Sequence, residues 1–303
     1  MAGRIAKLLK RQTLERPEIT EAIARLARLA EAQPDLCQAA SVQAALLRAM
    51  YAVPAPVTSY NLTAEEVMGR LTDGVPLLRN ALLPCTERHV RAAFLHLCAA
   101  ASRASVVATP AERVTSPYKA LAEAAQKERL ELWVYGNMLL AGTAQALPAH
   151  LEEQGYPADL VMTLLRLALL PFLEQTAAQL ASLDSSQPWD HGYCPMCGAW
   201  PVLAEQRGLE QRRYLRCGLC ASSWEVDRLL CPFCANRDHL LLGYLQVEGE
   251  EEKQRVATCE ACHGYLKLRS TLVPLTTPLL LVEEVALVHL DLIAMEKGYM
   301  PPI

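Results

Sequence analysis

The chain carries eight of its eleven cysteines between residues 194 and 262, where they form four Cys-x-x-Cys pairs. A single pair of this kind is compatible with a disulfide, a redox centre or half of a metal site. A Cys-x-x-Cys turn brings two thiolates and several backbone N–H groups to one point, and two such turns complete a tetrahedral site. Four pairs therefore supply ligands for two metal ions. The pairs are Cys194/Cys197, Cys217/Cys220, Cys231/Cys234 and Cys259/Cys262.

The separation between consecutive pairs predicts which of them share an ion. Consecutive pairs are 19, 10 and 24 residues apart. The two longer gaps leave room for a hairpin between the halves of one site, whereas the short gap suits a link between neighbouring sites. We therefore expect the first two pairs to form one site and the last two the other, with a crossed arrangement as the main alternative. Zinc and iron both accept four sulfur ligands in tetrahedral geometry, so the ligand set does not identify the metal.

Other uses of the pairs are less consistent with the sequence. The N-terminal segment has no apolar core of a secretory signal, so we expect a reducing, cytoplasmic compartment, where structural disulfides are rare. No βαβ pattern surrounds any pair, which disfavours a thioredoxin-like redox motif. Eight thiolates already complete two sites, so we expect the nearby histidines to be bystanders or hydrogen-bond donors to the ligands. These are His191, His239 and His263.

Three further cysteines and two aromatic residues have simpler expected roles. Cys37, Cys85 and Cys98 lie in helix-like surroundings, where we expect them to be small buried hydrophobic side chains. Trp224 and Tyr265 are expected to cover the metal modules, which contain few other core residues.

The first 185 or so residues have the periodicity of about seven or eight helices. Segments 19–35, 41–52, 86–102 and 118–142 each repeat apolar residues at helical spacing. Thr63 and Glu66 form a capping-box pattern. The most apolar stretch, 160–174, is short and is interrupted by an arginine and a proline. We therefore expect a buried core helix there and no insertion into a membrane.

The pattern changes at the polar segment 182–193, which we interpret as a linker. Beyond it, residues 212–234 alternate like short strands around tight turns, and 239–259 resembles a hairpin with an acidic tip at 248–252. Helical periodicity returns from Pro278 as one predicted helix that ends near Gly298. Its apolar face comprises Leu281, Val285, Val288, Leu292 and Met295.

These elements predict an α+β fold. A mainly helical N-terminal domain is followed by two small β-rich modules, each with four cysteines, and by a C-terminal helix that packs back on the body. The expected boundaries are 1–186 for the helical domain, 187–229 and 230–274 for the modules, and 275–303 for the last helix.

Charge and motif content argue against two classes of function. Residues 190–270 contain ten Lys or Arg and eleven Asp or Glu, and the one basic cluster is Arg212, Arg213 and Arg216, so a face for phosphate binding is not expected. The sequence has no Ser/His/Asp grouping, P-loop or GxGxxG motif, and Glu283 and Glu284 are expected to be solvated helix positions. Sites whose four positions are all filled by protein leave no place for a substrate. We therefore expect a protein that is not an enzyme.

Four segments resemble the formate dehydrogenase accessory protein family, FdhE. They are CPMCGAWP, RYLRCGLCASSWEVDRLLCPFC, CEACHGYLK and HLDLIAMEKGY, and the resemblance covers about the last third of the chain. Members of that family are cytoplasmic proteins with rubredoxin-like metal modules that are associated with iron. They are required for respiratory formate dehydrogenases, which contain molybdenum and are exported, and they act on the catalytic subunit before export.

The resemblance implies the ligands, the metal and the partner of this chain. One iron would be held by Cys194, Cys197, Cys217 and Cys220, and another by Cys231, Cys234, Cys259 and Cys262. Zinc is the alternative metal. The implied function is maturation of a formate dehydrogenase through its catalytic subunit. The alternatives are an iron-dependent redox partner that exchanges electrons with the client's active site and, less favoured, a zinc-ribbon protein that binds nucleic acid.

Overall fold

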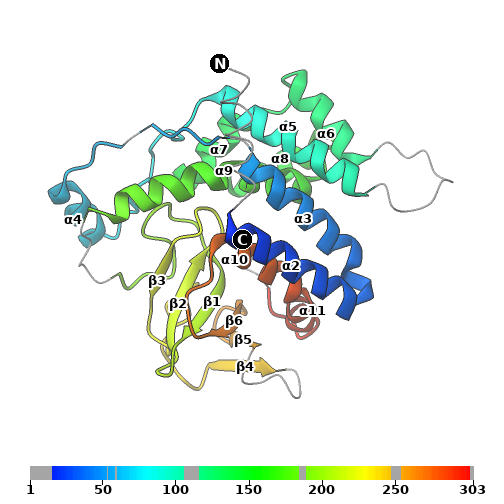
Figure 1. The fold of residues 1–303 in the computed structure, drawn as a ribbon. Coiled ribbons are helices and arrows are strands. Elements are labelled where there is room, and N and C mark those ends of the chain that lie inside the picture. The colour runs from blue at the N-terminus through cyan, green and yellow to red at the C-terminus, as the bar shows by residue number, and fades with distance from the viewer. Residues whose placement is uncertain are drawn as a thin grey trace.

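The computed structural model describes residues 16–52, 54–58, 60–105, 116–183, 189–246 and 254–300. It has the predicted α+β architecture, with a helical first part, a mixed sheet that carries the cysteine pairs, and helices at the end (Figure 1). The first part contains α2 (Pro17–Ala32), α3 (Cys37–Ala52), α4 (Ala64–Thr72), α5 (Glu87–Ala104), α6 (Pro117–Gln126), α7 (Leu132–Ala141), α8 (Leu147–Glu153) and α9 (Ala158–Ala181), with 3-10 turns η1 (Pro34–Leu36) and η3 (Ala144–Ala146).

Helix α9 is the centre of the helical part. Its length and composition would allow it to cross a membrane, but here it is the predicted core helix, with α3, α5, α7 and α8 packed against it. Residues on all of its sides are buried, as is typical of a helix that other elements surround. Arg166, the one basic residue of its sequence, forms an ion pair with Glu284.

Two details of the helical prediction are confirmed. Thr63 accepts a hydrogen bond from the backbone N–H of Glu66, whose side chain accepts one from the N–H of Thr63, so the capping box begins α4 as expected. In α5, the residues at the predicted helical spacing, Val90, Phe94 and Leu97, are all buried.

Residues 118–142 form two helices, not the one that their periodicity predicts. Helix α6 ends in a Schellman motif, in which the N–H groups of Glu128 and Arg129 bond to the carbonyls of Ala125 and Ala124. Glu128 adopts a left-handed conformation, with φ of 55°. The charged run KERLE at 127–131 contains no glycine to mark this turn, so the apolar period on either side looks continuous in the sequence.

The sheet consists of two antiparallel three-stranded units joined by a parallel pair. Its order is β3-β2-β1-β6-β5-β4, and the parallel contact lies between β1 and β6. The predicted hairpin of 239–259 is confirmed as the antiparallel pair β4/β5, although its acidic tip lies outside the described residues. The strands are β1 (Pro201–Arg207), β2 (Arg212–Cys217), β3 (Ser223–Glu225), β4 (Leu242–Gln246), β5 (Gln254–Cys259) and β6 (Tyr265–Thr271).

The C-terminal helix is broken into α10 (Thr277–Ala286) and α11 (Val288–Glu296). Leu287, at the break, is almost fully buried, as are Leu290 and Ala294 in α11. The break turns these three residues toward the protein. The predicted apolar face is therefore wrong after the break, where Leu292 and Met295 are exposed. Residues 285–288, at the break, are all apolar, so the pattern there does not specify which face is buried. Helices α10 and α2 pack side by side (Figure 1).

The three cysteines outside the pairs differ in burial. Cys85 and Cys98 are buried, as expected, and burial raises the pKa of each thiol to about 12. Cys37 is exposed, so the prediction for it is wrong. It is the first residue of α3, directly after the turn η1, where the helix face that packs on the core has not yet begun.

Candidate metal centres

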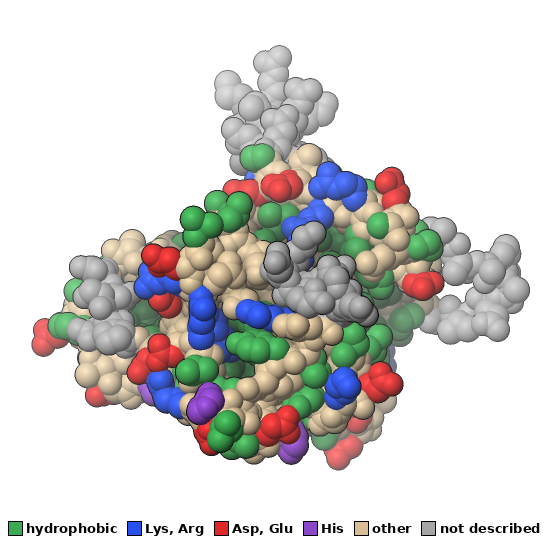
Figure 2. All heavy atoms as spheres, turned by 90° about the horizontal axis from the view of Figure 1, so that it is seen from below, with side chains coloured by type: hydrophobic (Ala, Val, Ile, Leu, Met, Phe, Trp, Pro, Cys, Tyr) green, Lys and Arg blue, Asp and Glu red, His purple; other side chains and the backbone are tan. Residues whose placement is uncertain are grey.

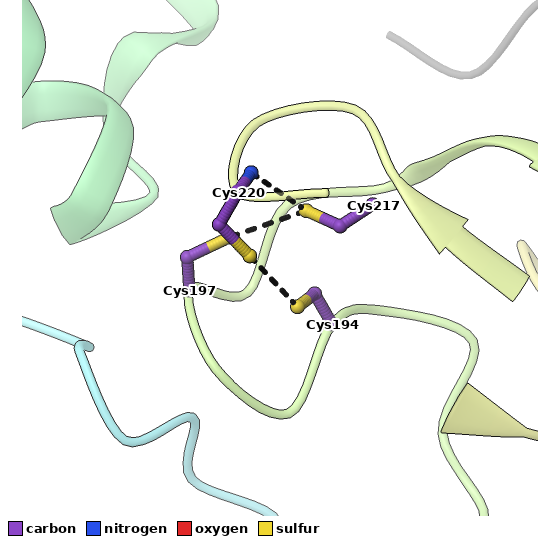
Figure 3. Close-up of side chains that lie close together, drawn as sticks. All are labelled: Cys194, Cys197, Cys217 and Cys220. Carbon is purple, nitrogen blue, oxygen red and sulfur yellow. Dashed lines mark hydrogen bonds between the residues drawn. The ribbon is translucent and has the colours of Figure 1, made fainter. Parts of the chain in front are cut away.

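The first two pairs come together in one cluster, which we name the first cluster. Two loops approach each other and direct the sulfurs of Cys194, Cys197, Cys217 and Cys220 toward a common point (Figure 3). The Sγ atoms of Cys194 and Cys220 are 3.6 Å apart, and those of Cys197 and Cys217 are 3.4 Å apart. The β1/β2 hairpin connects the two loops, which is the arrangement that the 19-residue gap predicts.

The last two pairs form the second cluster in the same way, with the β4/β5 hairpin between them. The Sγ atoms of Cys231 and Cys262 are 3.7 Å apart, as are those of Cys234 and Cys259. The side-chain amide of Asn236 donates a hydrogen bond to the Sγ of Cys259. The structure thus groups the pairs sequentially and not in the crossed arrangement.

All four pairs share one local conformation, which we call a knuckle: a Cys-x-x-Cys turn with the residues that follow it. In each, the N–H of the first cysteine donates to the carbonyl five residues later, for example from Cys194 to Ala199. The residue after the second cysteine is left-handed in every case, with φ between 53° and 79°. Glycine is free to adopt this conformation, whereas other residues do so at some cost. These residues are Gly198, Ala221, Ala235 and His263.

Both clusters fit a tetrahedral metal ion. A metal–sulfur distance of about 2.3 Å places the sulfurs of a tetrahedron about 3.8 Å apart. The Sγ–Sγ separations of 3.4–3.7 Å in the clusters approach this value, and all the cysteines are free of disulfides. Backbone N–H groups of Leu219 and Cys220 also donate to the Sγ of Cys217, as is typical of a thiolate ligand. Each cluster could therefore hold one ion.

The ionisation of the first cluster suits a cation. Burial raises the pKa of the Cys194 thiol well above its usual value. Burial also opposes ionisation of Cys217, but hydrogen bonds from the neighbouring thiols outweigh it and lower the pKa of Cys217. Among these sulfurs Cys217 is therefore the one most favoured as a thiolate, and a bound cation would stabilise the thiolate form of its ligands.

The two clusters differ in exposure. All four cysteines of the first cluster are at most 1% exposed. In the second cluster Cys231 and Cys259 are buried, but Cys234 and Cys262 are exposed. The difference arises because the segment before α5 covers the first cluster: the N–H groups of Leu77 and Leu78 donate to the carbonyls of Pro195 and Met196 inside the first knuckle. The helical part therefore helps to build the first cluster.

An ion pair connects the first cluster to two helices. Arg166 of α9 donates two hydrogen bonds to the carboxylate of Glu284 in α10, at 2.6 and 3.0 Å, and one to the carbonyl of Gly218 between two ligands. Glu283 is 1% exposed and pairs with Arg25 and Arg269. The expectation that Glu283 and Glu284 are solvated is therefore wrong, because each carboxylate has an arginine partner from another element.

The histidines and aromatic residues near the cysteine pairs have contacts within the protein or lie on its surface. The His191 ring stacks on that of Tyr193, with centroids 4.9 Å apart, and His239 is exposed. His263 supplies a backbone carbonyl that accepts a hydrogen bond from Met300. Trp224 and Tyr265 are buried, as expected of residues that cover the modules.

Each arginine of the predicted basic cluster has a partner within the protein. Arg213 and Arg216 are buried, and the exposed Arg212 pairs with Glu225. The face on which the sheet lies in Figure 1 carries Lys and Arg side chains interspersed with Asp and Glu (Figure 2). The described residues of this face therefore form no continuous basic surface of the kind that phosphate binding needs.

Replacement of one ligand is expected to empty one cluster. The variants Cys217→Ser and Cys259→Ser should each bind one ion per chain where the wild type binds two, because a site with three thiolates holds its ion less tightly. Each variant should also be cleaved faster by protease in the C-terminal third. Elemental analysis and limited proteolysis measure these effects. Cys37→Ser, at an exposed cysteine outside the clusters, is the control and should retain two ions. Ligand variants that keep both ions would contradict the assignment.

Comparison with known proteins finds similarity to FdhE proteins. The model of the FdhE central domain matches residues 193–228, which contain the first cluster. A FdhE homolog from Stutzerimonas stutzeri is 38% identical over 145 residues, which cover 44% of this chain and 46% of the relative. One from Aquifex aeolicus is 31% identical over 151 residues, which cover 48% and 52%. The matched part of the chain thus spans about half the length of these relatives.

A solved structure extends the likeness to almost the whole chain. The crystal structure of the FdhE protein from Pseudomonas aeruginosa matches with a TM-score of 0.65 and 26% identity, over 94% of this chain and 92% of that one. Because the match includes the helical part as well as both clusters, it is not limited to the cysteine motifs. The chain is therefore similar to FdhE proteins in its central segment, in about half of its sequence and in its fold.

Proposed function

We propose that this protein is an accessory factor for a formate dehydrogenase and binds the catalytic subunit of that enzyme in the cytoplasm before export. The observation that carries the proposal is the structural match over 94% of the chain to an FdhE protein, together with two clusters that fit metal ions. We also propose that residues 1–186 form the client-binding body, that 187–229 and 230–274 each hold one iron, and that 275–303 fasten the modules to the body.

The clusters support a binding role and not a catalytic one. An ion held by four thiolates has no open coordination position for a substrate, so its contribution would be to fix four chain segments in place. In the first cluster those segments contact the loop before α5 and, through Arg166, helices α9 and α10. A bound ion would therefore stabilise the contact between the sheet and the helical body, which a client would recognise as one surface.

Coprecipitation tests the proposal directly. The full-length, metal-loaded chain should retain the catalytic subunit of a formate dehydrogenase from the same cell, and a strain without the chain should lose formate dehydrogenase activity. An unrelated molybdenum enzyme serves as the control and should not be retained. Normal formate dehydrogenase activity in the deletion strain, or equal retention of both enzymes, would refute the proposal.

A further inference from the structure

A cavity of about 550 Å³ lies between the helical body and the first cluster. One wall comes from α7, η3, α8 and α9, and the opposite wall from the two knuckles of the first cluster. Its size lies within the range of ligand sites in proteins. The apolar part of the lining includes Leu139, Ala144, Pro148, Met162, Trp200 and Leu219.

Among the described residues that line this cavity are two arginines and no carboxylate. Arg166 is neutralised by Glu284, which lies outside the lining. Arg79 is half-buried and has no hydrogen bond or ion pair with any side chain among the described residues. A half-buried guanidinium with no carboxylate partner among the described residues is available to an anionic ligand, which would gain a charge-assisted hydrogen bond here.

The fold holds Arg79 in this position. Arg79 follows Leu77 and Leu78, whose backbone N–H groups bond to the first knuckle. Its guanidinium lies against Gly142, at the end of α7, and Gly198, in the knuckle, and a side chain at either glycine would collide with it. Both glycines have positive φ, and the space beside them is taken by the arginine. The helical body and the cluster thus present this cation to the cavity together.

We propose that the cavity binds an apolar segment of the client polypeptide that carries one acidic side chain, with its carboxylate on Arg79. This inference rests on the proposed function for the identity of the client. Charge complementarity supports the acidic group, since the described lining includes a guanidinium with no carboxylate partner in the described part of the chain. The apolar residues of both walls support the apolar part of the segment. Because Gly198, Trp200, Gly218 and Leu219 belong to or adjoin the knuckles, the ion of the first cluster would hold one wall of the site.

Two fluorescent probes that differ in one charge test the site. 1-Anilinonaphthalene-8-sulfonate and N-phenyl-1-naphthylamine share an aromatic skeleton, but only the first carries an anion. The metal-loaded full chain should bind one sulfonate probe, about tenfold more tightly than the neutral probe, because a charge-assisted hydrogen bond contributes at least this factor. Arg79→Gln should remove the difference and leave the neutral probe unaffected. Arg48→Gln, at an exposed arginine of α3, is the matched control and should change neither affinity.

A second variant distinguishes an effect on the cavity from an effect on the first cluster. Ala144→Phe places a phenyl ring in the cavity without altering either arginine, so both probes should bind at least tenfold more weakly while two ions are retained. If the Arg79→Gln variant loses metal, Arg79 balances the charge of the first cluster. The Ala144→Phe variant then decides whether the probe binds in the cavity. Unchanged binding of the sulfonate probe to Ala144→Phe would overturn the proposal.

Competition between the sulfonate probe and the client tests whether the client binds in the cavity. The catalytic subunit of a formate dehydrogenase should displace the sulfonate probe from the wild-type chain, and Ala144→Phe should retain less of the subunit. A subunit that coprecipitates normally but leaves the probe bound would overturn this inference while the proposed function stands. A subunit that does not bind at all would overturn both.

Discussion

A water-soluble chelator should remove the ion of the second cluster about 100-fold faster than that of the first. Cys234 and Cys262 are exposed, so a chelator can attack the second ion while the protein stays folded. The ligands of the first cluster are at most 1% exposed, and the loop before α5 bonds to the knuckle over them. Release from the first cluster therefore requires local opening, and a 100-fold difference corresponds to about 2.8 kcal/mol of opening free energy.

The two release phases can be assigned with one variant in each cluster. A chromogenic chelator added to the fully loaded chain should show a fast phase and a slow phase of equal amplitude. Cys234→Ser, which disables the second cluster, should remove the fast phase, and Cys197→Ser should remove the slow one. If wild-type protein releases both ions at one rate, the difference in burial has no bearing on metal exchange.

Much of each cluster could be predicted from the sequence because its ligands are close together in the chain. A Cys-x-x-Cys pair fixes two ligands by local geometry, and a hairpin of suitable length fixes the other two. The unequal exposure of the clusters could not be predicted in this way. It depends on Leu77 and Leu78, which lie more than a hundred residues before the first pair and carry no motif.

The partners of the buried charged residues could not be predicted from the sequence either. Glu283 and Glu284 look solvated because a helical pattern reports which residues are apolar, not which charges have partners. Their arginines come from α2, α9 and β6, so only the tertiary structure pairs them. Likewise, Arg213 appears in the sequence as part of a basic cluster, but its guanidinium donates to the carbonyl of Leu230, next to the first ligand of the second cluster. The missed residues thus connect elements that are distant in sequence.

Glu205 is the clearest case of such a connection and should be the residue most sensitive to substitution outside the clusters. Its carboxylate is fully buried in β1, where it pairs with Arg207 and Arg216 and accepts a hydrogen bond of 2.9 Å from the N–H of Leu275. Arg216 also donates to the carbonyl of Ala221, in the second knuckle of the first cluster. Glu205 therefore joins the sheet, the chain leading to α10 and the cluster.

Glu205→Gln should lower the free energy of unfolding by about 3–5 kcal/mol, because it leaves the charge of buried Arg216 without its partner. Chemical denaturation of the metal-loaded protein measures the change. Glu225→Gln is the matched control: its pair with Arg212 lies on the same sheet but is exposed, so its loss should cost at most about 1 kcal/mol. Equal effects of the two substitutions would show that burial of the Glu205 pair does not determine its contribution.

The effect of Glu205→Gln should also depend on pH. Burial by itself would raise the pKa of this carboxyl, but the hydrogen bonds and charges of Arg207 and Arg216 outweigh it and hold the pKa below its usual range. A group with a lowered folded-state pKa contributes stability that is complete above its unfolded pKa, about 4.3, and is lost as the pH falls through the folded value. The stability difference between wild type and Glu205→Gln should therefore be constant above about pH 5 and shrink in more acidic solution. Measuring both proteins at each pH cancels the common effect of acid on the clusters, and a difference that grows as the pH falls would mean that Glu205 is protonated in the native protein.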